Sequence, residues 1–187
     1  MRNGKQKSVS VREMVYTALF AAVLCAVAPF AVTIGPIPLS FATLVIYISA
    51  GTLGWKYGTV SVALYVALGA VGIPVFSNFE GGFHKIAGVS GGFIIGYILC
   101  ALGTGIIVMV FGKKTRAYVL GMVIGTILLY TCGMAWFMFQ SGNPLAASLT
   151  MCVLPFLPGD AAKIVVACIT VPKLRSALSG VSEGRFS

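Results

Sequence analysis

The chain has 187 residues, of which 58% are hydrophobic and only 9% are charged. Soluble domains usually carry about 25% charged residues, so this composition excludes an ordinary soluble globule and indicates a protein surrounded by lipid. The formal net charge of +9 does not indicate nucleic-acid binding, because the basic residues lie between apolar blocks and leave no exposed basic helix. Each membrane-spanning helix takes about 20 residues, so the length suits a single helical bundle.

Six apolar segments, separated by glycine, proline and polar residues, follow one another along the chain. The turn at 35–38, the glycines Gly54 and Gly58, and Pro74 mark the ends of the first three segments. A further apolar stretch at 145–154 is too short to cross a bilayer and is expected to be re-entrant or interfacial. We therefore predict an all-α membrane protein with six transmembrane helices, at 11–32, 39–53, 59–73, 91–111, 117–139 and 158–171.

The basic residues predict the orientation of these helices. If the N-terminus is cytoplasmic, every lysine and arginine except Lys85 and Lys163 lies on the cytoplasmic side, as the positive-inside rule requires. Both termini are then cytoplasmic, and the long polar loop at 75–90, between the third and fourth helices, is extracellular. The expected organisation is a cytoplasmic tail at 1–10, a transmembrane domain at 11–176 and a second cytoplasmic tail at 177–187.

Neither the cysteines nor the N-terminal segment predicts a separate function. The five cysteines include no CxxC pair, and we interpret them as small packing residues of the helices. The only histidine, His84, has no neighbours at metal-ligand spacing, so we predict no metal site. The basic N-terminus and the apolar run after it could resemble a signal peptide. That run is about 20 residues long and has no clear small-x-small cleavage site, so we expect it to be retained as the first span.

Asp160 and Lys163 are the first candidates for a functional site. Asp160 is one of only four acidic residues, and it stands three residues before Lys163 at the start of the sixth segment, so both side chains share one helix face. Charges at membrane depth are costly and usually face a protein interior or a water-filled site. The pair could be a self-satisfied ion pair with Asp160 as the helix cap. Alternatively, Lys163 could hold a ligand carboxylate while Asp160 accepts hydrogen bonds from ligand N–H groups.

The loop at 75–90 adds further candidates. Asn78 offers a donor and an acceptor between two aromatic residues, although a turn asparagine would look the same. Lys85 is a second candidate partner for a ligand carboxylate, although a solvated loop lysine is the simpler interpretation. Gly91 and Gly92 permit close backbone approach where the fourth helix begins, and free N–H groups there could face a ligand.

Ala18, Ala22 and Ala26 form a stripe of small residues along the first helix. Such stripes let helices pack closely in lipid. The stripe could pack inside this bundle or form a docking surface for a second membrane protein. Aromatic residues near the predicted helix ends, including Tyr97 and Trp136, are interpreted as interface aromatics.

Several sequence motifs of other protein classes are absent. The chain has no GxxxxGK[ST], HExxH or GxSxG motif, so we do not expect ATP hydrolysis by a P-loop or one of these enzyme sites. There is also no convincing internal repeat of the kind that many secondary transporters carry.

Several stretches, taken in order, resemble the BioY family. They are GAVGIPVF at 69–76, the glycines Gly81 and Gly82, GVSGGF at 88–93, GPIP at 35–38, and PGD at 158–160 with Lys163. BioY proteins are biotin-specific substrate-binding (S) components of energy-coupling factor (ECF) transporters. The resemblance implies a multi-pass protein of a prokaryotic plasma membrane that binds extracellular biotin and needs no cofactor. It would work with a transmembrane coupling subunit and two cytoplasmic ATPases, which would explain the missing P-loop.

The resemblance also implies roles for particular residues. The substrate-binding residues carried over by position are Asn78, Asp160 and Lys163, with Ser90, Gly91, Thr43 and Lys85 as further candidates, and the residues that would dock the coupling subunit are Ala18, Ala22 and Ala26. The chain departs from the family pattern in two places. The family usually reads GPTGGY where 88–93 reads GVSGGF, and Ala42 replaces a glutamine before Thr43.

Two other classes of function stay open at this point. A stand-alone secondary transporter of biotin or another small vitamin would need no ATPase partners. A membrane enzyme or assembly factor is the third class, but we can assemble no nucleophile–base pair around His84.

Overall fold

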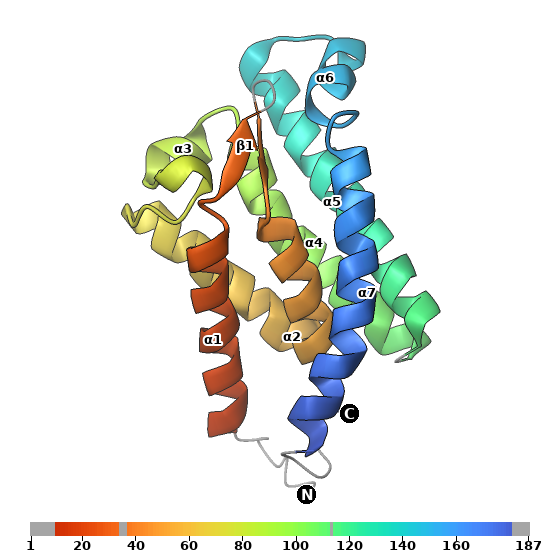
Figure 1. Ribbon diagram of the computed structural model, residues 1–187. Helices are drawn as coiled ribbons and strands as arrows, with labels where there is room; N and C mark the ends of the chain where they lie inside the picture. The colour runs from red at the N-terminus through yellow and green to blue at the C-terminus, as the bar shows by residue number, and fades with distance from the viewer. Residues whose placement is uncertain (1–9, 34–36, 113, 181–187) are drawn as a thin grey trace, which may run out of the picture.

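The computed structural model describes residues 10–33, 37–112 and 114–180, and most of this part of the chain is helical. Its helices are α1 (Val11–Val27), α2 (Ala42–Val71), α3 (Phe83–Ala87), α4 (Gly91–Phe111), α5 (Thr115–Ser141), α6 (Leu145–Cys152) and α7 (Leu157–Gly180). Two short strands, β1 (Ala31–Thr33) and β2 (Pro38–Ser40), pair antiparallel, and a single 3₁₀ turn, η1, covers Ser77–Phe79. Figure 1 shows the helices as an elongated bundle with β1 and β2 near one end.

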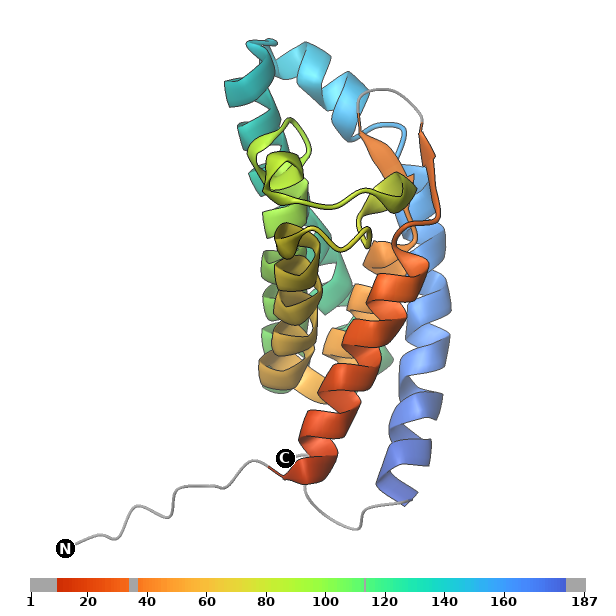
Figure 2. The ribbon, with the colours of Figure 1, turned by 90° about the vertical axis from the view of Figure 1, so that its left-hand side faces the viewer.

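The helix α2 consists of two arms that fold back on each other. Gly54, between the arms, has φ of 80° and ψ of −179°, a backbone conformation that is essentially restricted to glycine. A Cβ atom on Gly58 would lie only 2.6 Å from the Cα of Ala50, so the arms meet backbone to backbone just beyond the bend. Figures 1 and 2 show the change of direction. The arms correspond to the predicted spans at 39–53 and 59–73, but the non-helical backbone is confined to Gly54.

The centre of the bundle is formed by α2, α4 and α5. Large side chains with no or almost no exposed surface fill it, among them Tyr47, Tyr65 and Met122. Buried glycines lie along the facing sides of α4 and α5 and allow close packing of these helices. Among the described residues, α4 and α5 are each long and apolar enough to cross a membrane, and α6 with α7, bent by 49° at their junction, form a third possible span.

Several predicted boundaries were wrong. The first helix ends at Val27, because Pro29 follows and the chain then enters the β1–β2 hairpin, which we had not predicted. The sixth helix does not stop at residue 171 but continues to Gly180 and includes Pro172. The segment at 75–90, predicted as a loop, contains η1 and α3. The predicted short piece at 145–154 is the helix α6.

The two ends of the bundle carry different elements. Figures 1 and 2 show the start of α1 and the end of α7 at one end of the molecule. The hairpin, α3 and α6 lie at the other end, where α7 begins. The turn at 35–36 that we predicted as extended lies outside the described residues, whereas Pro38 belongs to β2. The polar side chains of the first helical turn of α7 therefore lie toward the hairpin end.

Candidate functional site

A buried ion pair lies at the start of α7. Asp160 is only 4% exposed and Lys163 only 8% exposed, and Lys163 Nζ lies 3.0 Å from Asp160 Oδ1. The two residues share one face because they are separated by three positions, with Asp160 in the first turn of the helix and Lys163 in the second. The ammonium group has three partners: it donates to Asp160 Oδ1 at 3.0 Å, to Thr43 Oγ1 at 2.9 Å and to the Ser40 carbonyl at 2.7 Å. All three N–H donors of the lysine are therefore engaged within the protein.

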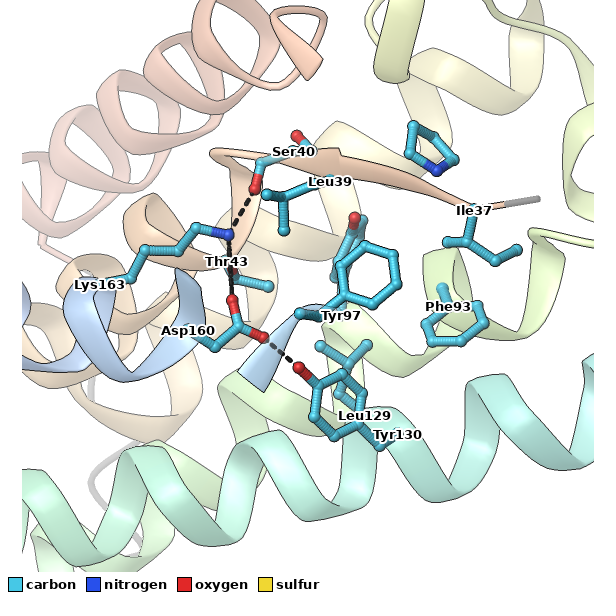
Figure 3. A pocket seen from close by; sticks show the side chains of 12 residues that line it. Ile37, Leu39, Ser40, Thr43, Phe93, Tyr97, Leu129, Tyr130, Asp160 and Lys163 are labelled. Carbon is cyan, nitrogen blue, oxygen red and sulfur yellow. Dashed lines mark hydrogen bonds and ion pairs between the residues drawn. The ribbon is translucent and has the colours of Figure 1, made fainter. Parts of the chain in front are cut away.

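The carboxylate of Asp160 keeps some capacity to accept hydrogen bonds. Besides Lys163, it accepts from Thr43 Oγ1 at 3.3 Å on Oδ1 and from Tyr130 Oη at 2.5 Å on Oδ2. A carboxylate offers about four lone-pair positions, so about one remains. Figure 3 shows the Asp160 carboxylate between Lys163 and Tyr130, with Tyr97 nearby.

Ser40 links this pair to two other elements. Its carbonyl accepts the bond from Lys163, while its hydroxyl donates to the Ala28 carbonyl at 2.8 Å. The same hydroxyl accepts from the N–H of Ala42 at 3.0 Å, in the first turn of α2. The end of the hairpin, the end of α1 and the start of α2 are thereby held together beside the ion pair.

Two adjacent cavities extend from the ion pair toward the hairpin end. The narrow cavity, of about 30 Å³, is lined by Asp160, Lys163 and Thr43 together with aromatic and aliphatic side chains. The larger cavity has a volume of about 180 Å³ and mixes polar and aromatic walls. Both cavities share Ile37, Pro38, Phe93 and Tyr97. The residues that line the narrow cavity are Ile37, Pro38, Leu39, Ser40, Thr43, Phe93, Tyr97, Leu129, Tyr130, Phe156, Asp160 and Lys163. The residues that line the larger cavity are Thr33, Ile37, Pro38, Tyr65, Phe76, Ser77, Asn78, Glu80, Lys85, Val89, Ser90, Phe93, Ile94 and Tyr97.

The η1 segment closes against the hairpin beside the larger cavity. The N–H of Asn78 donates to the Pro29 carbonyl at 2.9 Å, and its Nδ2 donates to Thr33 Oγ1 at 3.2 Å. Phe79 meets Phe30 edge to face, with the ring centroids 5.3 Å apart. Asn78 and Phe79 both have positive φ, of 63° and 58°, which is uncommon for residues other than glycine and costs free energy. These contacts hold the segment in a strained backbone conformation over the cavity.

The α3 segment is held from the other side by α5. Trp136 Nε1 donates to the Gly88 carbonyl at 2.9 Å, and Gln140 Nε2 donates to the Ala87 carbonyl. Lys85 in α3 forms an ion pair with Glu80, and both side chains line the larger cavity. Trp136, which we interpreted as an interface aromatic, therefore supports the wall of the cavity.

The structure brings most of the predicted site residues to these cavities. Asp160, Lys163 and Thr43 line the narrow cavity, whereas Asn78, Lys85 and Ser90 line the larger one. Gly91 lines neither. It is buried against the Ile86 carbonyl and Trp136, so close that a Cβ atom would not fit.

The alanine stripe does not pack inside the bundle. Ala18, Ala22 and Ala26 are all exposed, whereas Phe20 and Leu24 face the core. Of the two interpretations of the stripe, packing within this bundle is therefore wrong.

Tyr130, Tyr97 and Ser40 are site residues that the sequence analysis missed. Tyr130 lies in the middle of the fifth predicted span, where a phenolic hydroxyl needs a hydrogen-bond partner, and this signal could have identified it. Tyr97 was interpreted as an interface aromatic, but it lines both cavities. Ser40 acts partly through its backbone carbonyl, for which the sequence offers no signal. Within the described residues, no three histidine, cysteine or acidic side chains are grouped so as to hold a metal ion.

The chain is similar to known proteins in both sequence and fold. The model of the BioY family matches residues 3–180. "Biotin transporter BioY" of Thermotoga maritima is 32% identical over 166 residues, covering 88% of this chain and 96% of that protein. "Probable biotin transporter BioY" of Pyrococcus horikoshii is 33% identical, covering 89% and 98%. The crystal structure of the S-component for biotin from an ECF-type ABC transporter superposes with a TM-score of 0.80, at 28% identity, over 94% of this chain and 95% of that one. The chain belongs to the BioY family, and it is a multi-pass membrane protein of a prokaryote.

Proposed function

We propose that this protein binds biotin from outside the cell as the S component of an ATP-driven ECF importer. The observation that carries the proposal is the buried Asp160–Lys163 pair at the base of a two-part cavity, in a fold shared with an S-component for biotin. Concave, mostly apolar sites with a few convergent polar groups are typical of small-molecule binding. The names of the relatives supply the ligand.

The chemistry of biotin matches the two cavities. Biotin has a ureido ring with N–H donors, an apolar sulfur-containing ring and a valerate chain that ends in a carboxylate. The remaining acceptor position of Asp160 suits a ureido N–H, and Phe93 and Tyr97 suit the apolar ring. The carboxylate end then points into the larger cavity, toward Asn78, Ser90 and Lys85.

Of the two candidate lysines, Lys85 is the better partner for the carboxylate. Lys163 is buried and has all three donors engaged, and removing one partner of such a buried pair costs about 3–5 kcal/mol. The side chains of Lys85 and Glu80 are 31% and 45% exposed, and a pair as accessible as this contributes only about 0.2–1 kcal/mol. Lys85 can therefore change partner at little cost, while Lys163 keeps Asp160 in place.

The arrangement of the helices supports the predicted membrane topology. We propose six spans, formed by α1, the two arms of α2, α4, α5 and α7, with α6 as the re-entrant piece. Arg12 lies in the first turn of α1 and Lys173 in the second half of α7, and the start of α1 and the end of α7 lie at the same end of the bundle (Figure 1). The positive-inside rule makes this end cytoplasmic. The segment at 75–90 and both cavities then open to the outside, and residues 11–176 form the transmembrane domain between two cytoplasmic tails.

The exposed alanine stripe on α1 supports a docking role. We propose that Ala18, Ala22 and Ala26 contact a transmembrane coupling subunit, which joins the protein to two cytoplasmic ATPases. No cofactor is needed for binding.

Titration calorimetry of the detergent-purified protein with biotin tests the proposal. We expect tight binding by the wild type and at least tenfold weaker binding by Asp160→Asn, a loss of about 1.4 kcal/mol or more. Glu13→Gln is the matched control, because Glu13 lies in the first turn of α1 at the opposite end of the bundle. A folded wild type that does not bind biotin would refute the ligand assignment, and unchanged binding by Asp160→Asn would refute the site.

A further inference from the structure

The wall of the larger cavity carries one positive and one negative side chain. Among the described residues that line it, Lys85 is the only lysine or arginine and Glu80 the only carboxylate, and the two form an ion pair. The positive charge of Lys85, which a ligand carboxylate would need as its partner, is therefore already balanced by the carboxylate of Glu80.

The two residues are anchored by different parts of the structure. The Glu80 carbonyl accepts from the N–H of Phe76 at 2.8 Å, which fixes the backbone of Glu80 next to η1. Lys85 belongs to α3, whose end is held through Ala87 and Gly88 by side chains of α5. Because the backbones are fixed separately and both side chains are partly exposed, the pair can open by side-chain rotation alone.

The other lysine beside the cavities offers no alternative. Lys163 donates to three buried partners, and each would lose a hydrogen bond if the lysine turned to a ligand. A ligand carboxylate in the larger cavity therefore meets Lys85 as its nearest accessible cation and Glu80 as a competing anion.

We propose that Glu80 is a resident anion that competes with the carboxylate of the bound ligand for Lys85. This inference rests on the proposed function, in which the larger cavity receives the carboxylate end of biotin. Glu80 lowers the affinity for an acid compared with Lys85 alone, because the acid must displace it. Glu80 has no comparable effect on the affinity for a neutral ligand of the same shape, because such a ligand forms no ion pair with Lys85. The residue thus sets how strongly the site prefers an acid to a neutral analogue.

The test compares biotin with its methyl ester by titration calorimetry on four proteins: the wild type, Glu80→Gln, Lys85→Gln and the double variant. We expect Glu80→Gln to bind biotin about three- to fivefold more tightly, with unchanged affinity for the ester. Lys85→Gln should weaken biotin binding by a similar factor and leave the ester unaffected. The gain from Glu80→Gln should shrink when Lys85 is absent, because there is then no cation for which to compete.

Three results would overturn the inference. Unchanged or weaker binding of biotin by Glu80→Gln would show that Glu80 does not compete. An equal gain for biotin and ester would show a general effect on the cavity. An equal gain with and without Lys85 would show repulsion between Glu80 and the ligand in place of competition. The proposed function fails separately, if the wild type binds neither ligand. Glu13→Gln, with the same change of charge at the far end of the bundle, should leave both affinities unchanged.

Discussion

At the scale of single residues, the ion pair of α7 is stabilised by neighbours from three other elements. Lys163 reaches the end of β2 and the start of α2, and Asp160 reaches α5 through Tyr130. Each charge is buried, so the pair depends on all of these hydrogen bonds being present together.

We expect Lys163→Met to destabilise the protein by about 3–5 kcal/mol, because it leaves the buried carboxylate of Asp160 without its counter-charge. The double variant Asp160→Asn, Lys163→Met should recover part of this loss. Thermal unfolding in detergent measures the stability of the single and the double variant. Lys85→Met is the control, since its accessible ion pair with Glu80 is worth less than about 1 kcal/mol. Equal losses in the single and double variants would contradict the prediction.

Ser40→Ala should cost about 1–3 kcal/mol of stability. The change leaves the Ala28 carbonyl without its donor and the N–H of Ala42 without its acceptor, and Ser40 is buried. Ser49→Ala is a matched control on α2. The Ser49 hydroxyl is buried and has no hydrogen-bond partner among the described residues, so its removal should be close to neutral or stabilising. Chemical or thermal unfolding measures the stability of the two variants. Similar losses of stability would argue against a stabilising role for the hydrogen bonds of the Ser40 hydroxyl.

Sequence reasoning identified the charged half of the candidate site, and the family resemblance added Thr43, but two other neighbours were missed. Asp160 and Lys163 stand out because charges are rare in this chain and the i, i+3 spacing is local. The phenol of Tyr130 inside a predicted span signals a need for a hydrogen-bond partner, but the sequence does not show that this partner is Asp160. Ser40 gives no such signal, and only packing brings these two residues to Asp160 and Lys163.

At the scale of elements, the bend in α2 determines where its two arms lie in the bundle. The bend lets the first arm carry Thr43 to the ion pair while the second arm returns toward η1. Gly54 and Gly58 were recognised from the sequence as a break, but the close approach of Gly58 to Ala50 follows only from the angle between the arms.

Gly58→Ala should destabilise the protein by about 1–3 kcal/mol, because its Cβ would lie 2.6 Å from a backbone atom of Ala50 that cannot move independently. The control is Gly159→Ala in the first turn of α7. There the nearest atoms are 3.7 Å away, at the flexible end of the Leu39 side chain, so we expect little change. The difference in melting temperature between the two variants measures the effect, and equal melting temperatures would contradict it.

The short hairpin shows the limit of reading elements from hydropathy. Residues 28–33 continue the apolar run of the first helix, so hydropathy alone extends that helix to residue 32. The strands exist because β1 and β2 pair with each other, and a pairing between separate segments is not encoded in the hydropathy of either one.

At the scale of the whole molecule, binding and transport should be separable. Ala22→Trp changes the exposed face of α1, which contributes nothing to either cavity. We expect unchanged biotin affinity and at least a tenfold loss of ATP-driven uptake in vesicles that contain the coupling subunit and both ATPases. Ile127→Trp, at an exposed position of α5, is the control and should retain uptake. Uptake by vesicles that carry this chain alone would instead favour a stand-alone transporter.

The sequence by itself determined the membrane class, the approximate positions of the helices and the location of the buried charges, because hydropathy, helix-breaking residues and i, i+3 spacing act over short distances along the chain. Only the tertiary structure decided which groups complete the site. Lys163 meets Thr43 and Ser40 across separations of 120 and 123 residues, and Asp160 meets Thr43 across 117. Such contacts depend on how α2, α5 and α7 pack together. The same packing saturates Lys163 and leaves Lys85, which is paired with Glu80, as the accessible cation among the described residues that line the larger cavity.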